Sequence, residues 1–172
     1  YLPPDYEIEE DTQYPVLYMQ DGQNLFDNST SGFGEWHVDE HLNSLFDEGY
    51  IVPIVIGIDH GGSYRINEYS IEDSENYDIT PKGDLYLDFI KETLKPFVDS
   101  HYRTLSAKES TGIMGSSLGA IISAYAILTA SDVFNLAGIF SPSYKMAKSL
   151  YSYPLEKSES IRIYQLCGSN ES

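Results

Sequence analysis

Ser117 lies at the centre of Gly115-Ser116-Ser117-Leu118-Gly119, which matches the pattern G-x-S-x-G. The pattern is typical of a sharp strand-to-helix turn that lifts a nucleophilic serine hydroxyl above a sheet. Glycines two places before and after the serine leave room that Cβ atoms would fill. Three fixed positions arise by chance in about one chain of this length in twenty. The apolar run before the turn (112–114) and the apolar helix pattern after it (118–125) therefore carry much of the argument.

A serine nucleophile requires a base, a group that orients the base, and hydrogen-bond donors for the developing oxyanion. The backbone N–H of Leu118, at the start of the predicted helix, is one candidate donor. The loop after the first strand would supply the second donor, from Gly22 or Gln23. Asp21-Gly22 is also an ordinary turn signal, and without the serine motif we would weigh the two interpretations evenly.

Strands and helices that alternate along the chain must position these residues. We predict strands over 14–20, 51–59, 133–140 and 161–167, a short strand from 111, helices over 35–49, 83–98 and 118–129, and a turn with a short helix around 141–151. Residues 60–82 are predicted to form a long polar loop. This order predicts an α/β fold with a mostly parallel sheet between helices. The site of such a sheet lies beyond the carboxyl ends of its strands, where Ser117 is expected independently of its motif.

Periodicity also predicts which side chains face inward and which are buried. The helix over 35–49 is expected to place Val38, Leu42, Leu45 and Phe46 on one face. The helix over 83–98 is expected to turn its apolar face inward, with Tyr86, Phe89, Ile90, Leu94 and Phe97. Cys167 is the single cysteine, and its place in an apolar strand predicts a buried, unreactive thiol.

Bulk composition limits the classes of function. The chain has 172 residues, of which 41% are hydrophobic and 13% aromatic, so we expect one globular domain over 1–172. Its formal net charge is −17. That charge disfavours binding to nucleic acid or to an anionic membrane surface, and it also serves plain solubility. No apolar run is long enough for a transmembrane helix. The chain starts at Tyr1 inside a turn-like segment, so we expect an incomplete domain from a longer, cytoplasmic protein.

The four histidines (His37, His41, His60 and His101) all precede Ser117. His37 and His41 have the i, i+4 spacing of a metal-binding pair, but no third ligand at a suitable spacing supports a site. We therefore predict surface histidines, no metal and no organic cofactor. His101 ends a helix, where a cation is favourable. His60 lies at a strand tip and is a weak candidate for the base, which we expect beyond residue 172.

Several segments together resemble the esterase D-like family of α/β-hydrolases. This family includes feruloyl and acetylxylan esterases, siderophore esterases and S-formylglutathione hydrolase. The resemblance covers nearly the whole chain and rests on Tyr1–Glu7, Tyr14–Asp27, Trp36–Glu40, Ile54–Asp59, Arg65 with Glu68-Tyr69, Leu94–Thr104, Gly112–Ala120 and Phe140–Tyr144. It implies a three-layer α/β-hydrolase sandwich, which this chain would contain in a form truncated at both ends.

The resemblance also implies roles for individual residues. Ser117 is the nucleophile, and Leu118 with Gly22 or Gln23 forms the oxyanion hole. Glu171, which follows the last predicted strand, takes the place of the acid, because the order in this fold is serine, acid, histidine. Ala120 departs from the glycine often found there. The expected lining of a substrate cleft is Trp36, His60, Arg65 and Ser143, although Trp36 and Arg65 are as well explained by structural roles.

The leading hypothesis is a serine carboxylic-ester hydrolase that acts through an acyl-enzyme on Ser117. Two alternatives remain open. The same nucleophile could transfer the acyl group to a sugar or another alcohol, or the chain could be a non-catalytic hydrolase-fold fragment or binding domain. The expected substrate is a small-molecule or carbohydrate ester, and the sequence predicts no oligomeric state.

Overall fold

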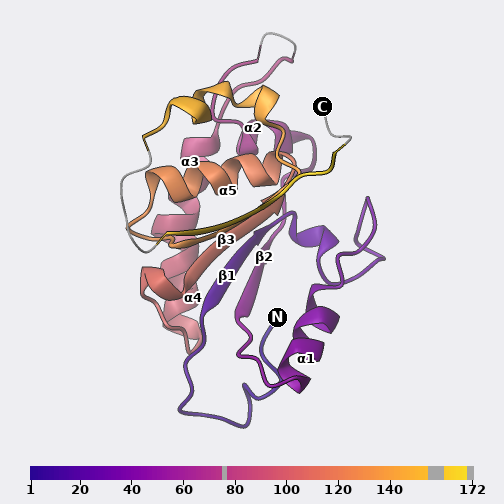
Figure 1. The fold of residues 1–172 in the computed structure, drawn as a ribbon, viewed down its shortest axis with the longest axis vertical. Coiled ribbons are helices and arrows are strands. Elements are labelled where there is room, and N and C mark those ends of the chain that lie inside the picture. The colour runs from indigo at the N-terminus through magenta and orange to yellow at the C-terminus, as the bar shows by residue number, and fades with distance from the viewer. Residues whose placement is uncertain (75–76, 155–160, 170–172) are drawn as a thin grey trace.

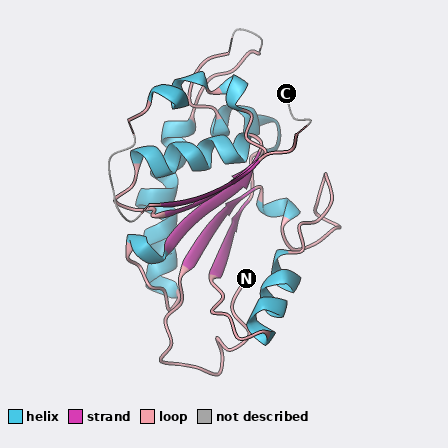
Figure 2. Ribbon diagram, viewed as in Figure 1, coloured by secondary structure: helices cyan, strands magenta, loops and turns pink. Residues whose placement is uncertain are grey.

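The computed structural model describes residues 1–74, 77–154 and 161–169, and it places a parallel sheet between two layers of helices (Figures 1 and 2). The sheet order is β2-β1-β3-β4-β5, and every neighbouring pair is parallel. The strands are β1 (Val16–Gln20), β2 (Ile54–Ile58), β3 (Thr111–Ser116), β4 (Leu136–Phe140) and β5 (Arg162–Leu166). The predicted α/β fold with a parallel central sheet is thereby confirmed.

The helices divide between the two faces of the sheet (Figure 1). On one face lies α1 (Val38–Asp47), whose Val38 and Leu42 pack near β1 and β2. The other face carries α2 (Arg65–Tyr69), α3 (Gly83–Phe89), α4 (Lys95–His101) and α5 (Leu118–Thr129). Short 3-10 helices span Gly22–Asn24, Gly62–Tyr64, Lys108–Ser110, Tyr144–Met146 and Lys148–Ser152. Among the described helices, none combines the length and the apolar character required to cross a membrane.

Helix α5 is the centre of the core. Its sequence is apolar on all sides, which is typical of a helix surrounded by protein. Nine of its residues are buried. Ile121 and Ile127 belong to the same hydrophobic cluster as Tyr18 of β1, Ile113 of β3 and Phe134, which precedes β4. Because α5 begins directly after Ser117, this packing holds the serine turn rigidly at the end of β3.

Three predictions about helices are wrong in detail. The loop over 60–82 contains α2, and the helix predicted over 83–98 continues to His101 through a π-helical segment at Ile90–Leu94. Each π turn uses i→i+5 bonds and rotates the inward face, so Val98 is buried and Phe97 is 52% exposed. Phe89 and Leu45 are also exposed, because neighbouring positions on α3 and α1 face the sheet instead.

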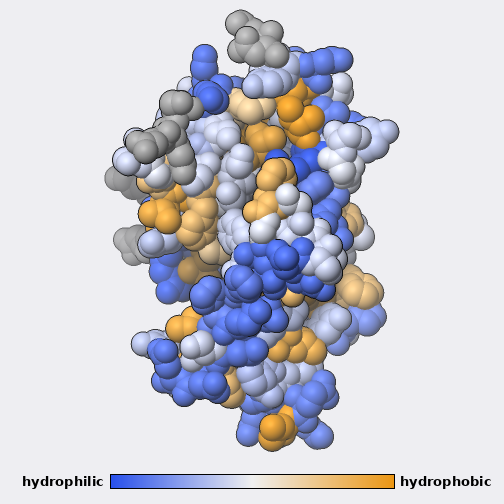
Figure 3. Space-filling model, turned by 90° about the vertical axis from the view of Figure 1, so that its right-hand side faces the viewer, coloured by the Kyte–Doolittle hydropathy of each residue, from blue (hydrophilic) through white to orange (hydrophobic). Residues whose placement is uncertain are grey.

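Strand β5 differs from its expected environment. All five of its residues are exposed, and Cys167, which follows it, is exposed rather than buried. The cause is its position at the edge of the described sheet, where it pairs with β4 alone. On the face shown in Figure 3, hydrophilic residues predominate and the hydrophobic residues form small, separate patches.

The buried hydroxyl of Tyr18 leads to a stability prediction. Tyr18 is fully buried, and its hydroxyl oxygen has no hydrogen-bond partner among the described residues. Removing such a group relieves a desolvation cost, so Tyr18→Phe should raise the free energy of unfolding by about 1 kcal/mol at neutral pH.

The advantage of Tyr18→Phe should grow above about pH 10, where tyrosines in the unfolded chain ionise. Burial, with a smaller contribution from the charge of Asp99, raises the pKa of folded Tyr18, so its contribution to stability is lost as the pH rises. Urea titrations at about pH 7 and pH 10.5 measure both effects. The exposed Tyr64→Phe is the matched control. Equal unfolding midpoints for Tyr18→Phe and the unmodified protein at both pH values would contradict this account.

Candidate active site

The turn at Ser117 has the strained geometry that its glycines predict. Ser117 adopts φ 58° and ψ −117°, a backbone conformation that residues other than glycine rarely adopt. A Cβ atom on Gly115 would lie 2.5 Å from the carbonyl carbon and oxygen of Gly119. A Cβ atom on Gly119 would lie 3.0 Å from the Cβ atom of Gln20. Only glycine therefore fits at position 115, and the steric argument from sequence is confirmed.

The Ser117 side chain lies between two strand ends. Its backbone N–H donates to the carbonyl oxygen of Phe140 at the end of β4 (3.0 Å). Its Oγ lies 3.1 Å from the Oγ of Ser143, in the loop after β4. Leu118 is the first residue of α5, and its N–H is one of the amides that a helix leaves unpaired at its positive end.

A cleft of about 510 Å³ opens beside Ser117. It brings together four of the predicted site residues, from three separate parts of the chain. These four are Trp36, His60, Arg65 and Ser117, and the rest of the lining is Gln20, Asp21, Asn24, Leu25, Phe33, Gly62 and Ser116. Ser143 joins this group through its contact with Ser117, whereas Gly22 and Gln23 lie in the adjoining turn.

The turn after β1 is tightly fitted to the end of β2. Asp21 is buried with left-handed φ 58°, and a 3-10 helix follows it at Gly22–Asn24. A Cβ atom on Gly22 would lie 2.5 Å from the Oδ1 atom of Asp59. The Gln23 side chain donates to the His60 carbonyl oxygen (2.9 Å) and accepts from the His60 N–H (3.2 Å). The two predicted oxyanion positions are thus held against the 59–60 segment.

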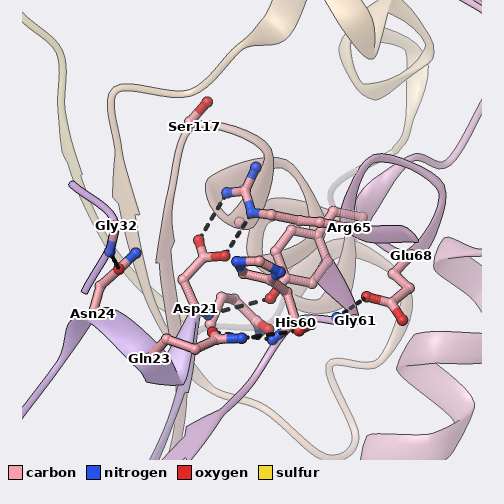
Figure 4. A network of polar contacts seen from close by, with 12 residues as sticks. Asp21, Gln23, Asn24, Gly32, His60, Gly61, Arg65, Glu68 and Ser117 are labelled. Atoms are coloured by element: carbon pink, nitrogen blue, oxygen red, sulfur yellow. Dashed lines mark hydrogen bonds and ion pairs between the residues drawn. The ribbon is translucent and has the colours of Figure 1, made fainter. Parts of the chain in front are cut away.

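Arg65 forms the strongest ionic contact in the cleft. Its Nε and Nη2 donate to the two carboxylate oxygens of Asp21 at 2.6 and 2.8 Å (Figure 4). Burial would lower the pKa of the guanidinium, but the hydrogen bonds and charge of Asp21 outweigh this and raise the pKa. Arg65 also lies over the ring of Tyr69, 5.0 Å from its centroid. Sequence reasoning placed Arg65 at the cleft but did not find its partner, because the pair joins positions 44 residues apart.

Two tyrosines continue this network below the cleft: Tyr69 is fully buried and Tyr86 is partly buried. The Tyr69 hydroxyl accepts from the Asp21 N–H (3.2 Å), and the Tyr69 ring meets that of Tyr86 edge to face at 5.1 Å. The Tyr86 hydroxyl donates to the side-chain carbonyl of Gln20. Burial raises the pKa of both hydroxyls, with the charge of Asp21 adding to the effect on Tyr69. Both tyrosines therefore remain neutral, and they serve as fixed hydrogen-bond partners.

Two aromatic residues, Trp36 and Phe33, line the cleft. The Trp36 ring meets the Phe140 ring edge to face with centroids 6.0 Å apart, and Phe140 in turn contacts Tyr164 at 5.8 Å. Phe33, which sequence reasoning missed, is 96% exposed in the loop before α1. Its loop has no periodicity, so no sequence signal marked it.

The histidines do not complete a triad with Ser117. All four are described, and none of them hydrogen-bonds to Ser117. His60 lines the cleft, but its Nδ1 accepts from the Gly62 N–H (3.0 Å). His101 stacks on Phe97, and His37 pairs with Glu35 and Glu40 at the start of α1. Glu171, the predicted acid, lies outside the described residues.

The predicted absence of a metal site was based on His37 and His41. The structure instead groups His37 with Glu35 and Glu40, whose potential ligand atoms lie within 4.8 Å of one another. His37 and Glu40 are exposed, and none of the three lines the cleft. Surface ion pairs are sufficient to explain this group.

The family model described as "Putative esterase" matches residues 1–165. The chain belongs to this esterase family. The resemblance inferred from its segments is therefore confirmed.

Three known proteins are similar to the chain in sequence or in fold. The chain is 30% identical over 181 residues to the uncharacterized protein YbbA of Bacillus subtilis (strain 168), covering 99% of the chain and 67% of YbbA. The fold is similar to the BES protein from Bacillus cereus, with 21% identity and a TM-score of 0.70 over 93% of this chain and 64% of that one. The siderophore hydrolase EstA from Aspergillus nidulans is similar at 20% identity and a TM-score of 0.70, over 93% and 59%. The chain thus spans 67%, 64% and 59% of the lengths of these three proteins.

The serine turn leads to a prediction for Gly115→Ala. The added methyl group would collide with the Gly119 backbone, which cannot move without displacing α5. We expect the free energy of unfolding to fall by about 2 kcal/mol or more, measured by urea denaturation. Gly32→Ala is the control, because a Cβ atom there meets nothing within 4 Å. Equal stability of the two variants would contradict the packing described for the turn.

Proposed function

We propose that the protein is a serine carboxylic-ester hydrolase and that this chain supplies its nucleophile and oxyanion hole. One observation carries the proposal: Ser117 stands in a strained left-handed turn, at the positive end of α5 and on the wall of a cleft. Strain of this kind costs about 1–3 kcal/mol and persists where the surrounding structure enforces it. The esterase family supports ester hydrolysis as the reaction class.

The proposed reaction follows from these positions. The Ser117 Oγ attacks the acyl carbonyl carbon, and its proton passes to a general base as the C–O bond forms. The N–H groups of Leu118 and of Gly22 or Gln23 donate to the resulting oxyanion. The intermediate then expels the alcohol, which takes up the proton, and water releases the acid from Ser117 by the same steps. We propose that Glu171 orients the base.

The cleft favours a small ester with an apolar, planar part. Its volume of about 510 Å³ lies in the range of small-molecule sites. Trp36 and Phe33 offer aromatic surface, while Asn24, His60 and Arg65 offer polar groups. The similarity to a siderophore hydrolase makes a siderophore ester one candidate substrate. A carbohydrate ester is a second candidate, because sugars bind through the same combination of aromatic stacking and hydrogen bonding.

Ser117→Ala should abolish cleavage of short-chain p-nitrophenyl esters by the full-length protein. Loss of the nucleophile typically lowers kcat by about 10⁶-fold. Labelling by a fluorophosphonate probe, located by mass spectrometry, should occur on Ser117 and disappear in the variant. Ser100→Ala on α4 is the control and should retain both signals. If histidine is the base, kcat/KM should fall as the pH drops through about 6.5.

Other outcomes separate the alternatives. Undiminished hydrolysis by Ser117→Ala would refute the assignment of the nucleophile. Acyl transfer to an added alcohol in preference to water would identify an acyltransferase. A full-length protein that neither hydrolyses esters nor reacts with the probe would be a non-catalytic member of the family.

A further inference from the structure

The turn that carries Gly22 and Gln23 is held at three points by one segment, residues 59–69. The Asp21 carboxylate is bound by the Arg65 guanidinium, and the Asp21 N–H donates to the Tyr69 hydroxyl. The side chain of Gln23 forms two hydrogen bonds with the backbone of His60. Figure 4 shows these contacts gathered on one side of the turn, below Ser117.

The turn requires such support because its first residue is strained. Asp21 is a buried residue other than glycine with φ 58° and ψ 49°. The left-handed conformation costs about 1–2 kcal/mol in an L-residue, although Asp and Asn adopt it more readily than most. Without external contacts, the residue after β1 would relax toward an extended conformation and move the following N–H groups.

The Arg65–Asp21 contact suits this task better than a point charge would. The guanidinium binds both carboxylate oxygens at once, which fixes the plane of the carboxylate as well as its distance. Both side chains are partly buried, at 26% and 12% exposed, so solvent screens the pair only in part. The ring of Tyr69 lies under the guanidinium of Arg65, and its hydroxyl accepts from the Asp21 N–H.

A direct role in attracting an anionic substrate fits the geometry less well. Asp21 occupies two of the guanidinium donors and neutralises its charge. Arg65 therefore presents little net positive charge to the cleft, in a chain of formal net charge −17. Its contacts favour control of the turn over recognition of the substrate.

We propose that Arg65 is a positioning residue: by clamping Asp21 it holds the turn in the conformation that aims the second oxyanion donor at the substrate bound on Ser117. This inference rests on the proposed function. It assigns to Arg65 an effect on the transition state, transmitted through Asp21 to the backbone N–H groups of Gly22 and Gln23. Displacement of a catalytic group by about 1 Å can lower the rate about 100-fold.

The kinetic test uses Arg65→Met, Arg65→Lys, Asp21→Asn and the double variant Asp21→Asn/Arg65→Met in the full-length protein. Each single substitution should lower kcat for a short-chain p-nitrophenyl ester by about 10- to 100-fold, with KM changed less than about threefold. The double variant should be no slower than the worse single variant, because both remove one interaction. A raised KM with kcat preserved would overturn the proposal, since Arg65 would then bind substrate. Additive losses would overturn it as well.

Lys95→Met is the matched control. Lys95 and Asp99 form an ion pair on α4 of similar length (2.7 Å) and similar exposure (13% and 22%), away from the cleft. This variant should retain kcat while losing a comparable ion pair. A loss of kcat equal to that of Arg65→Met would show a general effect of stability and would overturn the positioning role.

Hydrogen exchange measured by mass spectrometry provides a readout that does not depend on activity. Arg65→Met should accelerate exchange in the peptide that covers residues 21–25, whereas Lys95→Met should leave that peptide unchanged. Unchanged exchange in Arg65→Met would refute the clamp whatever the kinetics. Absence of ester turnover by the unmodified protein would instead overturn the proposed function, and the exchange rates would still decide whether Arg65 holds the turn.

Discussion

The architecture depends on a steric constraint at the junction of β3 and α5. Ser117 is held with φ 58°, and the chain can pass through that conformation only because Gly115 has no Cβ atom, while a Cβ atom on Gly119 would crowd Gln20. The strain is offset by α5, which is buried along most of its length and starts one residue later. The cleft is then assembled around this fixed point by the segments that follow β1 and β2. A change that loosens α5 would therefore alter the serine as well as the stability of the fold.

The sequence predicted the framework well where short-range patterns decide the structure. The end of α5 at Thr129 follows from the end of a local apolar run. The parallel direction of the strands follows from the alternation of strands and helices along the chain. The buried face of the helical segment from α3 to α4 was harder to predict. A π-helical segment at Ile90–Leu94 shifts the register, so that Phe97 faces solvent although a regular helix would bury it. Cys167 was misjudged because an apolar strand at an edge resembles one in the centre.

The candidate site was predictable in part. The motif located Ser117, and the rule for parallel sheets located the turn after β1. No local pattern links Asp21 to Arg65, because the partners belong to different elements and meet only once the sheet has formed. Phe33 and the contact between Ser117 and Ser143 depend on loop conformations that carry no periodicity. Glu171 stays a prediction, since it lies beyond the part of the chain that the structure describes.

The excess of acidic side chains has a consequence for how copies of this chain behave in solution. The formal net charge of −17 keeps the copies apart at low ionic strength. Salt at about 0.5 M shortens the range of that repulsion to a few ångströms, and the colloidal behaviour of the chain therefore follows the ionic strength of its buffer.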